Sequence, residues 1–317
     1  MWVYIARRVL LSIPVLLGIT FLIFFIAHNL PGGPLAMYLN TPTITHAQIV
    51  HLEIQLGLNR PLLVQYAAWL WQALQGNFGH SFVDGQPVVT VIGQRVPATL
   101  ELMLTAIVLS YALAFVLGVA SAVGQYSPFD YVVTVLSYTG MALPVFWLGI
   151  MLILVFAVDL HWFPTFGMSS TPTGYSLADN LHHLVLPVVT LAVYTLAQES
   201  RYVRSSMLEV MQQDYIRTAR AKGLTERTVL FRHALRNALL PVVTVMMLDF
   251  AFLISGAVVT ETVFAWPGMG RLFFDSLQQG NYPVVIGIAV LVSVMVVLMN
   301  IVADVVYALI DPRIQYR

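Results

Sequence analysis

The residue whose type and position most suggest chemistry is Asp249. It interrupts an apolar stretch that runs from about Ala238 to Thr260. A carboxylate at such a depth in a membrane is costly, and it usually faces a cavity or a partner. We hypothesise that Asp249 lines a solute path, where it meets a cationic group of the cargo. The alternative is a structural role, either as a hydrogen-bond partner of a neighbouring helix or as a protonated acid.

The other acids close to apolar runs suggest structural roles. Glu101 and Asp304 fall at the ends of predicted spans, where a carboxylate can reach the interface or cap a helix. Glu199 precedes Arg201 and Arg204, and we expect it to pair with these neighbours.

Residue types that serve catalysis and metal binding give little further support. The 317 residues contain no cysteine, which excludes disulfides, thiolate ligands and a cysteine nucleophile. Ser255 lacks the GxSxG context of a nucleophile elbow. The eight histidines are scattered and form no HExxH motif, so no metal site is predicted. We therefore expect neither an enzyme nor a metalloprotein.

The position of the only lysine indicates whether the chain can bind ATP through a phosphate-binding loop. A phosphate-binding loop needs a lysine within GxxxxGK[ST], where it contacts the nucleotide phosphates. The only lysine is Lys222, which lies between Ala221 and Gly223. The sequence therefore predicts that this chain has no such ATP site of its own.

Basic residues concentrate in one segment, from Arg201 to Arg236. This segment holds eight of the 15 lysines and arginines, and apolar runs flank it on both sides. Positive loops remain on the cytoplasmic side of a membrane, so residues 201–236 are predicted to form a cytoplasmic loop. The eight residues are Arg201, Arg204, Arg217, Arg220, Lys222, Arg227, Arg232 and Arg236.

The centre of this segment predicts a helix, a glycine turn and a second helix. Asp214 is placed to cap the first helix, on which Arg217 and Arg220 share a face. Gly223 is placed to end that helix in a left-handed turn, and Thr225 is placed to cap the next helix.

The elements that carry Asp249 and the basic segment are predicted to be transmembrane helices. Hydrophobic residues make up 59% of the chain and charged residues 9%, which is typical of a polytopic membrane protein. A span needs about 20 apolar residues. Prolines at 14, 144, 187 and 241 are expected to kink helices or to start them. The predicted six spans cover about residues 9–27, 99–124, 131–158, 184–197, 238–260 and 283–303.

The distribution of basic residues predicts the orientation. With the N-terminus inside, 12 of the 15 lysines and arginines lie on the cytoplasmic side, which supports two cytoplasmic termini. Residues 28–97 then form an extracytoplasmic loop with short helices over Thr45–Gly57 and Leu62–Leu74. We expect residues 1–317 to form a single transmembrane permease domain.

Motifs along almost the whole chain resemble one family. Arg217-Thr218-Ala219 with Gly223 and Leu240-Pro241 resembles the "EAA" loop of permease subunits of binding-protein-dependent ABC importers, in its dipeptide and oligopeptide variant. Arg217 stands where the family has glutamate. Further segments resemble the member with the long first outer loop: residues 30–34, 56–62, 76–81, 95–102, 264–270 and 311–314.

This resemblance implies an all-α permease of the type I ABC importer fold, with a cytoplasmic coupling helix, in the cytoplasmic membrane. It implies half of a translocation path for dipeptides or oligopeptides, with a peptide ammonium as the cation that Asp249 meets. The implied partners are a second homologous permease, two ATPase subunits that hold ATP and magnesium, an extracytoplasmic binding protein and the lipid bilayer, with no nucleic acid. The residues implied in coupling to the ATPase are Arg217, Thr218, Ala219, Arg220, Lys222, Gly223 and Leu224.

Two other functions stay open at this point. A nickel or other small-solute ABC permease has the same architecture. A secondary transporter is the more distant alternative, and it predicts inverted repeats and several ion-site carboxylates at mid-span. Only Asp249 is evident at mid-span in this sequence.

Overall fold

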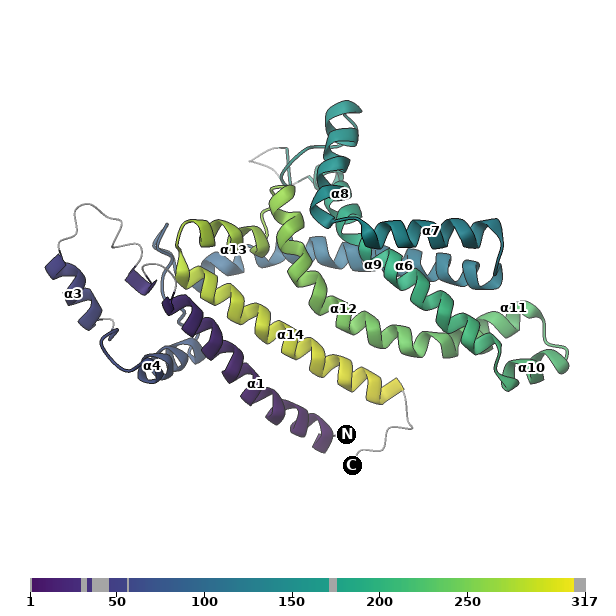
Figure 1. Cartoon of the computed structure of the whole chain (residues 1–317), viewed down its shortest axis with the longest axis horizontal. Helices are drawn as coiled ribbons and strands as arrows, with labels where there is room; N and C mark the ends of the chain where they lie inside the picture. The colour runs from purple at the N-terminus through teal and green to yellow at the C-terminus, as the bar shows by residue number, and fades with distance from the viewer. Residues whose placement is uncertain (1, 30–32, 36–45, 56, 171–175, 311–317) are drawn as a thin grey trace. The chain divides into compact units, whose positions relative to one another are not determined.

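The computed structural model describes residues 2–29, 33–35, 46–55, 57–170 and 176–310 (Figure 1). This part of the chain is helical, and its only β-type pairing is an isolated bridge between His80 and Pro87. The predicted all-α class is therefore confirmed. Contacts between residues group the chain into two units, Met1–Thr99 with Pro267–Leu298 and Leu100–Trp266 with Met299–Arg317. The prediction of a single permease domain stays a prediction.

The first unit is built around a small apolar core. Val88 and Ile92 of α5 pack against Val284 and Ile288 of α14. A Cβ at Gly287 would lie 2.6 Å from the Val88 side chain, so this glycine permits the close approach of the two helices. The unit contains α1 (Trp2–Asn29), η1 (Gly33–Leu35), α3 (His46–Gln55), α4 (Leu62–Leu74), α5 (Val88–Gly93), α13 (Met269–Gln278) and the start of α14 (Tyr282–Ile310).

The two short helices predicted between the first spans are both present. α4 has the predicted bounds, and it begins directly after Pro61, whose fixed φ suits a helix start. α3 covers most of the other predicted helix, while its predicted cap, Thr45, lies outside the described residues.

The second unit is organised around α9, a helix of 35 residues. A Cβ at Gly118 of α6 would lie 2.6 Å from the Ser200 carbonyl oxygen, and one at Gly140 of α7 would lie 3.1 Å from the Ala197 Cβ. Glycine therefore lets α6 and α7 pack closely on α9. The elements are α6 (Val96–Val123), α7 (Pro128–Ala142), α8 (Val145–Leu152), η2 (Ile153–Asp159), α9 (Leu177–Met211), α10 (Asp214–Ala221), α11 (Glu226–Thr228), η3 (Val229–Ala234) and α12 (Leu235–Val263).

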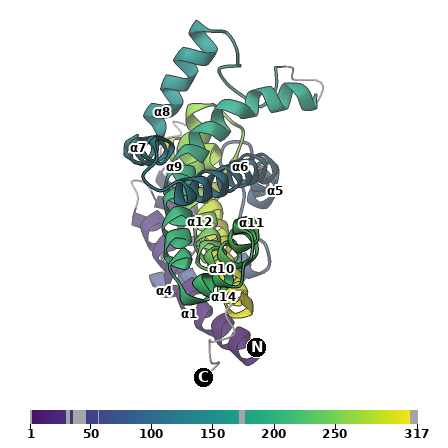
Figure 2. The same cartoon turned by 90° about the vertical axis from the view of Figure 1, so that its right-hand side faces the viewer.

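The predicted span over residues 131–158 is broken at Pro144. α7 and the helix that continues from α8 through η2 meet at 105°, and Figure 2 shows α8 leaving the line of α7. Proline lacks a backbone N–H and disfavours the α conformation at the preceding residue, here Leu143, which has extended backbone angles. The kink at Pro144 was predicted, and the span over residues 131–158 stays a prediction.

The number of membrane spans is only partly tested. In the described part of the chain, four helices are long and apolar enough to cross a membrane, and the bent pair at Pro144 makes a possible fifth. The remaining predicted span lies within α12, several of whose side chains are outside the described set. The count of six spans stays a prediction.

Candidate functional site

The centre of the basic segment contains a short helix, α10, with one buried and one exposed face. Ile216 and Ala219 of α10 are buried, at 0% and 7% exposure, and they anchor the helix to its own unit. Arg217 leaves 74% of its side chain exposed on the other face. Thr218, Arg220 and Lys222 are exposed as well. Of the residues predicted to contact an ATPase, only Ala219 has a buried side chain.

The turn after α10 has the predicted glycine geometry. Gly223 has a φ of +77°, in the left-handed region that glycine adopts most readily. The Thr225 hydroxyl accepts a hydrogen bond from the Thr228 N–H at 3.4 Å, so the predicted cap of the second helix is present. The prediction for Asp214 was wrong. Gln213 occupies the cap position without a side-chain bond, and Asp214 lies within the first turn.

An ion pair closes the turn, and the same segment also has exposed apolar side chains. Arg220 Nη2 lies 2.8 Å from Glu226 Oε1, which links α10 to α11 across Gly223. Leu224, Tyr215 and Phe231 are 41%, 43% and 60% exposed. The segment from α10 to η3 thus exposes both charged and apolar side chains.

Asp249 lies in a cluster with two other titratable side chains. The Tyr111 hydroxyl donates a hydrogen bond to Asp249 Oδ2 at 2.8 Å. Glu199 of α9 faces both the Asp249 carboxyl and the Tyr111 hydroxyl. Glu199 is fully buried, and its Oε2 finds no hydrogen-bond partner within the described residues. The cluster therefore brings two carboxyl groups together with no basic side chain bonded to either of them in the described structure.

A cavity of about 400 Å³ opens beside this cluster. Glu199 is part of its wall, and Val245 lies in the wall one helical turn before Asp249. The described residues that line it are Met141, Gln198, Glu199, Arg201, Tyr202, Ser205 and Val245.

A second buried carboxylate is neutralised by a basic partner. Arg204 of α9 donates to both carboxylate oxygens of Asp130 at 2.7 Å, and Asp130 is 3% exposed. The Ser121 hydroxyl and the Tyr126 N–H also donate to this carboxylate. One carboxylate thus joins the ends of α6, α7 and α9.

The expected pairing of Glu199 with nearby arginines was wrong. Arg204 pairs with Asp130, and the Arg201 guanidinium lies 4.1 Å from the centre of the Tyr138 ring. Within the described structure, Glu199 bonds only to Gln198, at 3.5 Å. The helical phase of α9 turns Glu199 toward α6 and α12 instead.

Comparison with known protein families identifies the chain. Residues 114–316 match the binding-protein-dependent transport system inner membrane component, and residues 1–103 match the N-terminal model of the same systems. The chain belongs to this permease family. The permease is therefore a membrane component of a binding-protein-dependent transport system.

Relatives resemble the permease over almost its whole length. The oligopeptide transport system permease protein AppB of Bacillus subtilis is 48% identical over 99% of both chains. The dipeptide transport system permease protein DppB of Escherichia coli K12 is 39% identical over 99% of both chains. The glutathione transport system permease protein GsiC of Salmonella typhi is 41% identical over 99% of both chains.

A solved structure supports the fold of the permease. An amino acid ABC transporter with histidines matches at a TM-score of 0.52 and 14% identity, over 69% of this chain and 94% of the other. At that identity the match concerns the fold alone. It agrees with the predicted type I ABC importer permease fold.

The sequence singled out Asp249 but not the groups around it. Tyr111 lies 138 residues before Asp249, so no local spacing signals their contact. The same holds for Asp130 and Arg204, which are 74 residues apart. Among the described residues, no three histidine or acidic side chains gather in a metal-binding arrangement. The expectation that this chain binds no cofactor stays a prediction.

Proposed function

We propose that the permease is the transmembrane subunit of an ATP-driven importer of short peptides. The observation that carries this proposal is the likeness to oligopeptide, dipeptide and glutathione permeases, each at least 39% identical over nearly the full chain. All three names refer to peptides or to a small peptide, whereas none of these relatives is named for nickel. The names of these relatives therefore support short peptides as the cargo.

The coupling segment is the second part of the proposal. We assign contact with an ATPase subunit to Arg217, Thr218, Arg220, Lys222 and Leu224, with Ala219 as an anchor and Gly223 as the turn. The exposed charge on α10 and the buried Ile216 support this role, because a helix fixed on one side transmits force applied to the other.

The remaining partners follow from the same proposal. A second homologous permease completes the path, two ATPases hold ATP and magnesium, and a binding protein delivers cargo from outside. Both termini of the permease lie in the cytoplasm. Lys222 lies outside any phosphate-binding motif, which supports the assignment of ATP hydrolysis to the partner subunits.

The path through the permease is proposed to pass the Tyr111–Glu199–Asp249 cluster. Two carboxyl groups beside a cavity of about 400 Å³ offer an anionic contact for the ammonium group of a peptide. The hydrogen bond from Tyr111 holds the Asp249 carboxyl in position. Glu199 thereby joins Asp249 as a residue of the proposed path.

Coupling is tested with Gly223→Val in the complete importer, reconstituted in vesicles with its binding protein. A β-branched residue resists a φ of +77°, so we expect peptide uptake to fall at least tenfold while ATP hydrolysis continues. Uptake of a labelled dipeptide and phosphate release are measured on the same vesicles.

The matched control is Gly76→Val. Gly76 has a φ of +80° and, like Gly223, has open space where a Cβ would project, but it follows α4. The control is expected to transport normally. Normal uptake by Gly223→Val would contradict the coupling role, while nickel uptake without dipeptide uptake by the wild type would contradict the cargo class.

A further inference from the structure

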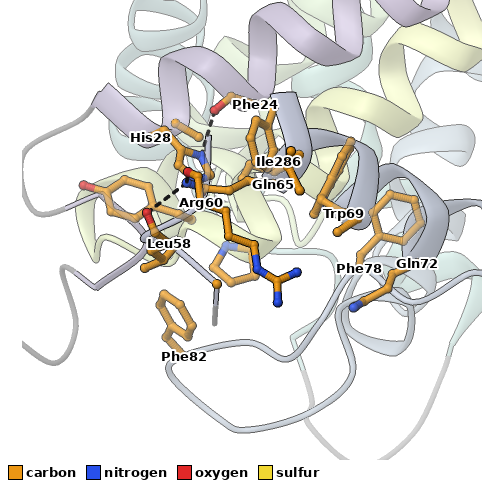
Figure 3. A pocket seen from close by; sticks show the side chains of 16 residues that line it. Phe24, His28, Leu58, Arg60, Gln65, Trp69, Gln72, Phe78, Phe82 and Ile286 are labelled. Carbon is orange, nitrogen blue, oxygen red and sulfur yellow. Dashed lines mark hydrogen bonds between the residues drawn. The ribbon is translucent and has the colours of Figure 1, made fainter. Parts of the chain in front are cut away.

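A cavity of about 350 Å³ in the first unit has a guanidinium group and aromatic side chains in its wall (Figure 3). Its wall is formed by the end of α1, the loop before α4, α4 itself, the segment after α4 and the start of α14. The 16 lining residues include Arg60 and His28 but no aspartate or glutamate. Among the described residues of the wall, no acid therefore balances the positive charge of Arg60.

Arg60 supplies the guanidinium group of the cavity. Its guanidinium extends into the pocket, with Phe82 on one side and Trp69 on another (Figure 3). It makes no hydrogen bond or ion pair with any residue of the described ranges. A Cβ on Gly57 would lie 3.7 Å from the Cδ and Nε atoms of Arg60, and Gly57 has a φ of +69°. The turn thus directs a free guanidinium into the cavity.

Hydrogen-bonding groups hold the His28 ring in the wall of the cavity. Gln65 Nε2 donates to the carbonyl oxygens of Leu58 and Arg60, at 2.9 and 2.8 Å. Gln65 Oε1 is therefore the atom that faces His28 Nε2, at 2.9 Å. His28 Nδ1 lies 3.1 Å from the Phe24 carbonyl oxygen. Both ring nitrogens of His28 therefore lie within hydrogen-bond distance of oxygen atoms of the cavity wall.

Aromatic side chains form the apolar part of the cavity wall, and the same helix, α4, also carries exposed apolar side chains. Phe24 packs against Trp69, with ring centres 5.5 Å apart, and Trp69 packs against Phe78 at 6.4 Å. α4 has no buried residue, and its Trp71 and Leu74 are 68% and 75% exposed. An amphipathic helix with exposed aromatic and apolar side chains is typical of the membrane interface.

We propose that this cavity binds a phospholipid. Its phosphate group contacts the Arg60 guanidinium beside His28, and an acyl chain lies along Phe24, Trp69 and Ile286. His28 is in the last turn of a span, so the cationic end of the cavity is at the level where lipid headgroups lie. A guanidinium recognises phosphate through paired N–H donors, which fits Arg60 better than it would fit a lysine. The lipid fixes α4 to α1 and α14.

The test is native mass spectrometry of the complete importer in detergent, titrated with dioleoylphosphatidylglycerol. Loss of a charge-assisted hydrogen bond weakens binding by roughly tenfold or more. We therefore expect Arg60→Gln to bind the tightest lipid at least tenfold more weakly than the wild type. Arg60→Lys is expected to retain part of the affinity, because it keeps the charge but loses the paired donors.

The matched control is Arg271→Gln. Arg271 carries the same charge in the same unit, but it lies on α13 near Asp275, at 3.6 Å. Its substitution should leave lipid binding unchanged. Thermal unfolding of every variant is followed in parallel, and Arg60→Gln is expected to unfold at the wild-type temperature once detergent has removed the lipid.

A second variant and two competitors identify the ligand class. Trp69→Ala removes part of the acyl wall and should weaken lipid binding while Arg60 remains. Equal lipid affinity of Arg60→Gln, the wild type and Arg271→Gln would overturn the proposal. Displacement of the lipid by millimolar inorganic phosphate would identify a small-anion site. Displacement by a free dipeptide but not by its C-terminal amide would identify a cargo carboxylate site, and either result would replace the lipid.

Discussion

Two buried acidic sites that each include a residue of α9 stabilise their carboxyl groups in different ways. At Asp130, every strong interaction comes from a donor: two nitrogens of Arg204, the Ser121 hydroxyl and the Tyr126 N–H. At Glu199 and Asp249, the Tyr111 hydroxyl is the one donor bonded to Asp249 in the described structure. A carboxylate that is fully bonded holds helices together, whereas one with spare acceptor capacity is suited to receive a ligand.

The largest expected effect comes from breaking the satisfied site. Arg204→Gln leaves the Asp130 carboxylate buried without its cation, which destabilises a protein by about 3 kcal/mol or more. The complex should unfold at a clearly lower temperature in a thermal stability assay. Arg217→Gln is the control, because the Arg217 side chain is 74% exposed and its distance to Asp214 is 3.7 Å. Equal unfolding temperatures for the two variants would mean that Asp130 is not a structural anchor.

The next effect tests the helix contact between the two sites. A Cβ at Gly118 would overlap the Ser200 carbonyl and the Val203 side chain, so Gly118→Ala is expected to cost about 1–3 kcal/mol. Gly18→Ala, inside α1, has nothing within 4 Å of the added carbon and should be neutral or slightly stabilising. Denaturation of the two purified variants compares them directly, and a neutral Gly118→Ala would disprove the tight α6–α9 contact.

A substitution in the Glu199–Asp249 site should reduce peptide transport without reducing the stability of the complex. Asp249→Asn keeps a hydrogen-bond acceptor for Tyr111 but removes the carboxylate, so we expect peptide uptake to fall by about tenfold, the effect of losing one charged contact. Complex assembly, followed by size-exclusion chromatography, should be unchanged. Wild-type uptake would exclude the path role, and failed assembly would assign Asp249 to structure.

The smallest effect concerns a neutral hydrogen bond between the sites. The Ser137 and Ser200 hydroxyls lie 3.0 Å apart, and Ser200 also bonds to the Ala197 carbonyl oxygen at 3.2 Å. Ser137→Ala therefore leaves Ser200 bonded, and its cost is expected to be about 1 kcal/mol or less. A loss as large as that of Arg204→Gln would show that the two sites form one network.

The sequence predicted what depends on local order and missed what depends on helix phase. Gly223, Thr225 and the bounds of α4 follow from backbone preferences of neighbouring residues, and they appeared as predicted. The bend at Pro144 was predicted as a kink, but its size of 105° depends on the packing of both halves.

The candidate site was less predictable than the fold. Asp249 stood out because a charge within an apolar run is visible in one dimension. Glu199 was assigned to its neighbours in sequence, since nothing in the chain shows which way a helix is rotated about its axis. The cavity beside Arg60 was not predicted for a similar reason, because its wall combines residues from α1, α4 and α14.

The continuity of α9 has a mechanical consequence. Helix rise places Glu199 about 18 Å from Met211, where α9 ends just before α10, and the described structure has no break between them. The hydrogen-bonded backbone makes this part of α9 rigid. A rotation of α9 at Met211 therefore rotates Glu199 through nearly the same angle. The two hydrogen bonds from Arg204 to Asp130, about midway between these two residues, oppose that rotation.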